Sequence, residues 1–195
     1  MANTTGRGAR SRATILQAAL ELCAERGYHA VTMEAIATRA QVGKPTLYRW
    51  WPSKGMLFLD ALTERFGEPY FQVGDTGDIV ADLRDWLHRV TDLFCDPVSS
   101  DLVAGVAGTA QHDPELAAIT HRQVHLTLSG RNQDRIRAAQ RDGQLTGFDP
   151  LLLEDLLVAP LWYRLLITGR PVDHAYADTV LDTVLSTARP PSDDA

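Results

Sequence analysis

The stretch from Thr32 to Leu57, TMEAIATRAQVGKPTLYRWWPSKGML, constrains the fold more than any other part of the sequence. Thr32 is a good helix N-cap and Glu34 places negative charge in the first turn, so we expect a helix to begin at Met33. This helix ends at the turn Gln41-Val42-Gly43. The stretch therefore predicts two short helices joined by a tight turn.

The second helix of this pair is expected to begin at Lys44, with Pro45 in its first turn, where a missing N–H does no harm. Leu47 and Trp51 share one face, and roughly the opposite face carries Lys44, Pro45, Tyr48 and Arg49. A polar face on a helix held by a short turn is the shape that enters a DNA major groove. A helical hairpin with a solvated polar face gives the same pattern, so both interpretations stay open on spacing alone.

If the helix reads DNA, its side chains suit distinct roles. Arg49 can pair with a guanine edge and Thr46 can touch a thymine methyl group. Tyr48 and Lys44 can reach phosphates. The pattern thus predicts that a short segment of one helix contacts both the bases and the phosphate backbone of the DNA.

The run from Ala13 to Leu62 closely resembles the N-terminal domain of the TetR family of bacterial transcriptional regulators, through ILQAALELCAERGY and AVTMEAIATRAQVGKPTLYRWWPSKGML. The resemblance implies a supporting first helix, a recognition helix over 44–50, and a phosphate contact from Lys54. The family usually has Gly at position 41, Ser at position 43 and Phe at position 51. The candidate DNA-binding residues are Thr32, Lys44, Pro45, Thr46, Tyr48, Arg49 and Lys54.

Charge is distributed unevenly along the 195 residues, although the net charge is −6. Residues 1–66 hold nine Lys or Arg against five Asp or Glu, a net charge of +4, and residues 67–195 hold ten against twenty, a net charge of −10. A basic head on an acidic body suits a protein that presents one end to DNA, although a solvated charge imbalance has the same appearance. The overall acidity fits poorly with a protein that coats DNA non-specifically.

Helix signals continue to the end of the chain, and no strand pattern competes with them. Helices are expected from Asp78 to Cys95, from Ser99 or Ser100 to near Gln111, and from Asp113 to about Asp142. We therefore expect an all-α protein with a three-helix helix-turn-helix domain and a C-terminal helical domain for ligand binding and dimerisation, about nine helices in all. The expected divisions are a flexible arm (1–9), the DNA-binding domain (10–55, with a fourth helix to about 66 as the link), the effector-binding and dimerisation domain (67–189) and a disordered tail (190–195).

The last two helices, over about 150–188, carry more apolar residues than one buried face needs, and Pro160 is expected to bend the first of them. Burial within the monomer would explain this excess. The family resemblance instead implies that these helices pair with their copies in a second subunit, which makes a homodimer on a near-palindromic operator. It also implies repression, relieved by an unknown small-molecule effector.

Candidate effector-binding residues are the large aromatics of the body with the polar groups near them: Trp86, Phe94, Arg122, His125, Trp162 and Tyr163. Aromatics at helical spacing are also what a plain core contains. An alternative function is a helical metal-dependent hydrolase that uses His112, His121 and His125, but the pattern HRQVH lacks the glutamate of a metalloprotease motif. We expect no cofactor and no metal site.

Cys23 and Cys95 are the only cysteines, and two unclustered cysteines indicate buried thiols in a reducing compartment. No apolar run reaches the roughly 18 residues of a membrane span, and the N-terminus lacks an apolar signal core. The expected location is therefore the bacterial cytoplasm, in association with the nucleoid, with no membrane partner.

Overall fold

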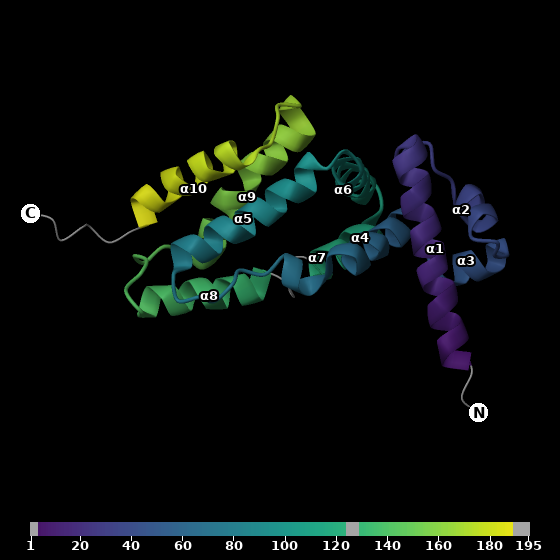
Figure 1. The fold of residues 1–195 in the computed structure, drawn as a ribbon, viewed down its shortest axis with the longest axis horizontal. Helices are drawn as coiled ribbons and strands as arrows, with labels where there is room; N and C mark the ends of the chain where they lie inside the picture. Colours follow the sequence, from purple (N-terminus) through teal and green to yellow (C-terminus); the bar gives the residue numbers. More distant parts are fainter. Residues whose placement is uncertain (1–3, 124–128, 189–195) are drawn as a thin grey trace, which may run out of the picture. The chain divides into compact units, whose positions relative to one another are not determined.

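The computed structural model describes residues 4–123 and 129–188, and within these ranges every regular element is a helix, which confirms the all-α prediction (Figure 1). The elements are α1 (Thr4–Arg26), α2 (Met33–Arg39), α3 (Lys44–Trp50), α4 (Lys54–Tyr70), α5 (Ile79–Cys95), α6 (Pro97–Ala110), α7 (Pro114–His121), α8 (Gly130–Arg141), α9 (Pro150–Tyr163), the π-helix η2 (Arg164–Thr168) and α10 (His174–Ala188). None of the described helices is long and apolar enough to cross a membrane.

The chain forms two compact units. The N-terminal unit comprises Met1–Gly67 together with Pro97–Ala118, and the C-terminal unit comprises Glu68–Asp96 together with Ile119–Ala195. Helix α6 and most of α7 thus pack with the helix-turn-helix, although the sequence interpretation placed them in the C-terminal domain. The predicted functional division near residue 67 stays a prediction.

Helix ends in the N-terminal unit follow the local capping signals. Thr32 accepts a hydrogen bond from the backbone N–H of Ala35 at 3.2 Å, as an N-cap does, and Gly27 ends α1 in a left-handed conformation with φ 78°. The start of α1 differs from the prediction, because the backbone is helical from Thr4. Residues 4–9 of the predicted flexible arm are thus part of α1, their flexibility stays a prediction, and residues 1–3 lie outside the described part.

The turn between α2 and α3 contains Gln41 at φ 55°, the one non-glycine residue with positive φ among those described. A left-handed conformation costs an L-residue about 1 kcal/mol, so Gln41→Gly should raise the free energy of unfolding by about 0.5–1 kcal/mol. The thermal midpoint followed by circular dichroism should rise by roughly 1–4 °C. Gln41→Ala keeps the strain and should give no increase, whereas a glycine variant no more stable than wild type would refute the strain.

Tyr28 organises the packing of α6 in the N-terminal unit. Its hydroxyl lies 2.8 Å from Thr109 Oγ1, and its backbone N–H donates to Asp101 Oδ2 at 2.6 Å. Its ring lies so close to Gly105 that a Cβ built there would be 2.2 Å from a ring carbon. Gly105 is therefore required for this close approach, because any side chain would push α6 away from the ring.

The two cysteines differ in environment. Cys23 is buried, and burial, together with the carboxylate of Asp101, raises the pKa of its thiol to about 11. Cys95 is exposed, so the expectation of two buried thiols is wrong for it. It is the last residue of α5, and its thiol donates to the backbone carbonyl of Val172 at 2.6 Å.

In the C-terminal unit, α5 is capped by Asp78 as predicted and lies against α9 and α10 (Figure 1). The buried side of α5 carries Ile79, Leu83, Trp86, Leu87, Val90 and Phe94. Asp82 on the same helix is also buried and pairs with Arg135 of α8 at 2.7 Å. Burial alone would raise the pKa of Asp82, but hydrogen bonds from Thr76 and Arg135 outweigh it and hold the pKa below its usual value.

The predicted helix from Asp113 to about Asp142 is described as two pieces, α7 ending at His121 and α8 beginning at Gly130, with residues 124–128 outside the described part. Helix α9 begins after its N-cap, Asp149, whose side chain accepts from the Leu152 N–H at 2.8 Å. Pro160 lies inside α9, and the wider turn of η2 follows within four residues. Gly169 ends this segment in a left-handed conformation at φ 62°.

Candidate nucleic-acid interface

Two apolar anchors hold α3 against the rest of the N-terminal unit. Leu47 is fully buried and Trp51, directly after the helix, is 4% exposed, as their shared face predicted. The helix begins at the N-cap Gly43, whose carbonyl accepts from the Thr46 N–H at 2.9 Å, and Pro45 occupies the first turn. The opposite face of this seven-residue helix is therefore left to solvent.

That outward face carries the predicted DNA-contacting side chains. Lys44, Pro45, Tyr48 and Arg49 are exposed, with Tyr48 at 43%, and Thr46 is half-buried. Tyr48 and Arg49 are thus not part of the core, whereas burial of these side chains would have ruled out their predicted role. Thr32 is exposed as well, at the start of α2.

Trp50, at 40% exposure, was not among the predicted contact residues. It lies beside the buried Trp51, with ring centroids 6.0 Å apart. Successive residues of a helix point about 100° apart, so one tryptophan of the pair can anchor while the other faces solvent. The adjacent tryptophans in the sequence could have indicated this exposure. A narrow apolar face can bury only one of two neighbouring side chains.

The ion pair of Lys44 on this surface is weak enough to leave its ammonium available for binding a phosphate. Lys44 lies 3.3 Å from Glu34 of α2, with both side chains largely exposed. The pKa of Glu34 is lowered mainly because its carboxylate accepts a hydrogen bond from the backbone N–H of Glu34 itself, and in addition because it accepts one from Lys44. Such an exposed pair is weak, so a phosphate can compete for Lys44.

Lys54 is placed differently from the prediction of a phosphate contact. Its ammonium donates to the carbonyls of Tyr28 at 2.9 Å and Val31 at 3.2 Å, and it lies 4.2 Å from the centre of the Tyr28 ring. Burial lowers the pKa of Lys54, against the opposing influence of Cys23 and Asp101. In this conformation the ammonium holds the loop between α1 and α2, and its contact with phosphate stays a prediction.

The Lys54→Met variant separates these two roles, because methionine keeps the apolar stem and removes the ammonium. We expect it to destabilise the protein by about 1–3 kcal/mol, since two carbonyls lose a charged donor. The slope of log affinity against log salt concentration should stay unchanged if Lys54 acts only on the loop. A slope shallower by about 1 for each subunit bound to DNA would instead assign it a direct phosphate contact.

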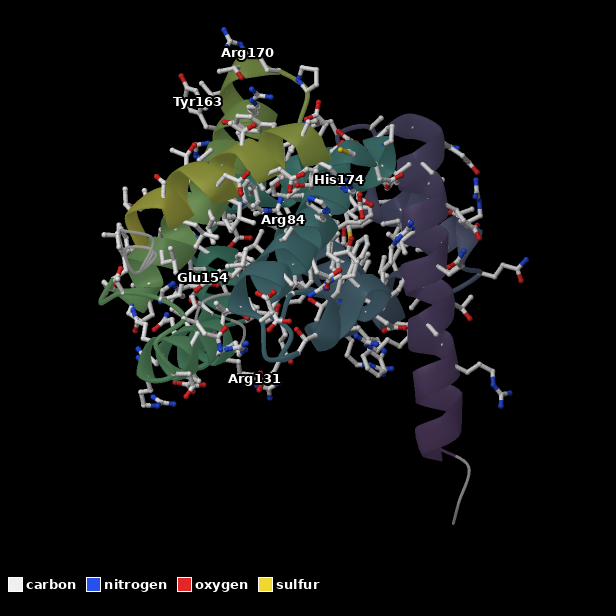
Figure 2. All side chains as sticks on the ribbon, turned by 60° about the vertical axis from the view of Figure 1, so that its left-hand side comes forward. Arg84, Arg131, Glu154, Tyr163, Arg170 and His174 are labelled. Atoms are coloured by element: carbon white, nitrogen blue, oxygen red, sulfur yellow. The ribbon has the colours of Figure 1, made fainter. Side chains whose placement is uncertain are left out.

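The predicted effector residues that the structure describes lie in different surroundings. Trp86 and Phe94 are buried on α5, where the Trp86 indole donates to the Phe71 carbonyl at 2.8 Å, and Phe94 packs edge-on against Trp162 at 5.0 Å. Tyr163 is 58% exposed and lies on the outer side of its helix (Figure 2). Arg122 is exposed, and His125 lies outside the described residues.

A depression of about 410 Å³ lies along α5 in the C-terminal unit. It is lined by Asp78, Val80, Ala81, Arg84, Asp85 and His88. Arg84, labelled in Figure 2, is engaged there by Asp178 and Asp182 of α10. His88 lies 2.9 Å from Asp178. The depression therefore shares no residue with the predicted effector set.

The three histidines of the alternative hydrolase do not make a site in the described structure. His112 and His121 are both exposed, and His125 is outside the described residues. Within 4–123 and 129–188 no group of three or more metal-ligating side chains is close enough to hold an ion. Nothing observed favours this alternative.

An exposed apolar stripe follows α9 and η2. Its first five members recur every three or four residues on one side of the helix, and the sixth directly follows the fifth: Leu152, Leu156, Ala159, Tyr163, Leu166 and Ile167. Ile167 is 70% exposed. The opposite side of α9 is buried at Leu153, Leu157 and Leu161, so this helix is apolar on two sides, as the sequence predicted.

Known proteins match both parts of the chain. Residues 15–61 match the family described as "Bacterial regulatory proteins, tetR family", and residues 73–184 match "Tetracyclin repressor-like, C-terminal domain". The chain is 31% identical to the uncharacterized HTH-type transcriptional regulator YdeS of Bacillus subtilis, over 83% of this chain and 81% of the relative. It is 30% identical to the DNA-binding transcriptional repressor TetR of Mycobacteroides abscessus, over 92% and 94%.

Solved structures agree with this assignment. The TetR family transcription regulator SCO0332 superposes with a TM-score of 0.75 at 32% identity, over 92% of this chain and 99% of that one. Both family matches, the relatives and the helix-turn-helix geometry lead to the same conclusion. The chain belongs to the TetR family of bacterial DNA-binding transcriptional regulators.

Proposed function

We propose that this protein is a repressor that binds a near-palindromic operator as a homodimer and responds to a small-molecule effector. The observation that carries the proposal is the outward polar face of α3, anchored from behind by Leu47 and Trp51. Repression is supported by the relative from Mycobacteroides abscessus, which is named a DNA-binding transcriptional repressor. Such a regulator acts on the chromosome and therefore in the bacterial cytoplasm.

The proposed DNA contacts divide into base reading and positioning. Arg49 pairs with a guanine edge and Thr46 packs on a thymine methyl group. Lys44 and Tyr48 contact phosphates beside them, and Pro45 lies at the end of α3 that enters the groove. The hydroxyl of Thr32 caps α2 as an acceptor, which leaves its own hydrogen for a phosphate oxygen.

The proposed dimer forms through α9, η2 and α10. A second copy is the occupant that suits the apolar stripe, because a two-fold pair of reading helices matches a two-fold operator. The two α3 helices would enter successive major grooves about 34–36 Å apart along the duplex. Exposed apolar residues at a three- and four-residue spacing are the pattern with which helices pair across an interface.

The proposed effector binds in the C-terminal domain and shifts the protein towards a conformation with lower operator affinity. Trp86, Phe94, Trp162 and Tyr163, with Arg122 and His125, remain the candidate contacts. The segment 54–66, the straight part of α4 before the non-helical Gly67, joins the domains in sequence. Allosteric coupling in such systems is usually about 1–3 kcal/mol.

Selection of bound sequences from random duplex DNA tests this proposal most directly, because it reports binding, symmetry and spacing together. We expect enrichment of an inverted repeat whose half-site centres lie about one helical turn, or a multiple of it, apart. Enrichment of a single half-site would contradict the dimeric mode of binding. Recovery of unselected sequences would contradict sequence-specific binding.

A further inference from the structure

One carboxylate in the N-terminal unit joins the end of the recognition helix to two other helices. The indole of the buried Trp51 donates its N–H to Asp60 Oδ2 of α4 at 2.9 Å. A buried tryptophan N–H normally finds such a partner. The hydrogen bond is therefore the polar counterpart of the apolar contacts that hold Trp51.

The same oxygen atom, Asp60 Oδ2, lies 2.6 Å from the guanidinium of Arg12 on α1. Arg12 also pairs with Glu64, one turn further along α4. Asp60 thus accepts from α1 and from the residue that directly follows α3, and a single side chain connects three elements.

The orientation of α3 about its own axis decides which side chains meet the bases. A helix of seven residues has little stability of its own and takes its orientation from its anchors. Leu47 contributes non-directional apolar contact, which tolerates rotation. The hydrogen bond from Trp51 is directional and weakens when the helix turns, so it is the anchoring contact most sensitive to the rotation of α3.

We propose that Asp60 is a positioning residue for operator reading, which through Trp51 sets the angle at which Tyr48 and Arg49 are presented to the bases. This inference rests on the proposed operator-reading role of α3. It concerns discrimination between sequences, because a helix that rotates within the groove loses base contacts while long, flexible side chains still reach phosphates. A residue that only stabilised the fold would leave discrimination by the folded protein unchanged.

The test compares affinity for the duplex enriched by selection with affinity for a scrambled duplex of the same composition, at a temperature well below the thermal midpoint. Trp51→Phe keeps a buried ring and removes the indole donor, and we expect the affinity ratio to fall about tenfold or more, the scale of one lost hydrogen bond to a charged group. Asp60→Leu should do the same. Asp60→Asn keeps an acceptor oxygen and should recover most of the ratio.

Glu64→Gln is the matched control, because it weakens a second pair of Arg12 on the same helix and leaves Trp51 and Asp60 in place. Its affinity ratio should equal that of the wild type. Circular dichroism and the thermal midpoint identify any variant that fails to fold, and Trp51→Phe then decides, as the mildest change.

The outcomes separate the inference from the function on which it rests. If the wild type discriminates but folded Trp51→Phe and Asp60→Leu discriminate equally well, Asp60 is not a positioning residue. If the affinity ratio falls as much in Asp60→Asn as in Asp60→Leu, discrimination depends on the charge of Asp60 and not on its acceptor oxygen. That result contradicts the inferred role of the hydrogen bond from Trp51. If the wild type itself does not discriminate, the proposed operator reading fails, and the inference fails with it.

Discussion

Arg49→Ala is expected to lower affinity for the selected operator by about a hundredfold or more, while helix content and dimerisation stay unchanged. One bidentate contact between arginine and guanine is worth about 1–3 kcal/mol, and a symmetric dimer makes it twice. Arg49 is exposed, so its removal leaves no cavity in the N-terminal unit. Tyr48→Ala should show a comparable loss, because its exposed ring lies on the same face. Titration of a labelled duplex measures both effects.

Arg137→Ala provides the matched control for Arg49→Ala. Arg137 is an exposed arginine on α8, paired with Asp134 three residues before it, and its loss removes the same charge. We expect its operator affinity to stay within about twofold of wild type, since single distant charges act weakly through salt. Unchanged affinity in both Arg49→Ala and Tyr48→Ala would remove these residues from the DNA interface.

Ala159→Glu is expected to convert the protein to a monomer and to reduce operator affinity by at least about a hundredfold. Ala159 lies in the exposed apolar stripe of α9, so a glutamate there is solvated in the monomer but buried opposite a second stripe in the proposed dimer. Burying an unpaired carboxylate costs several kcal/mol. A monomer also reads only one half-site. Light scattering coupled to size exclusion would measure the mass.

Ala118→Glu makes the identical substitution at an exposed position of α7 and should leave both mass and affinity unchanged. Because both variants replace alanine by glutamate, a difference between them is due to the position of the substitution. A dimer that survives Ala159→Glu would mean that the stripe on α9 is not at the subunit interface. A monomer that keeps full operator affinity would instead contradict the need for two reading helices.

The helix-turn-helix was predictable from the sequence because its signals are local. Thr32, Gly43 and Pro45 act on the turn in which they stand, and Leu47 and Trp51 reveal the buried face through a spacing of four residues. The same is true of the stops at Gly27 and Gly169. Such features depend on backbone geometry over a few residues, and the rest of the chain does not alter them.

Other features depend on residues far apart in sequence, and no local pattern could reveal them. The ammonium of Lys54 meets carbonyls 23 and 26 residues earlier in the chain, and the indole of Trp51 meets a carboxylate on the next helix. The aromatic residues proposed for the effector site were selected because they are large aromatics, with no information about their neighbours in space. The structure uses Trp86 and Phe94 in packing, since large apolar rings stabilise a core as readily as they bind a ligand.

The contact of Gly105 with the ring of Tyr28 has a practical consequence for the construction of hybrid regulators. Residues 97–118 belong to the N-terminal unit in space but are encoded between two segments of the other unit. A chimera spliced once at Gly67 would unite the Tyr28 of one parent with the α6 of another, and any residue larger than glycine at position 105 would collide with the ring. Exchange of the C-terminal unit therefore requires three junctions rather than one, so that residues 97–118 and the rest of the N-terminal unit come from the same parent.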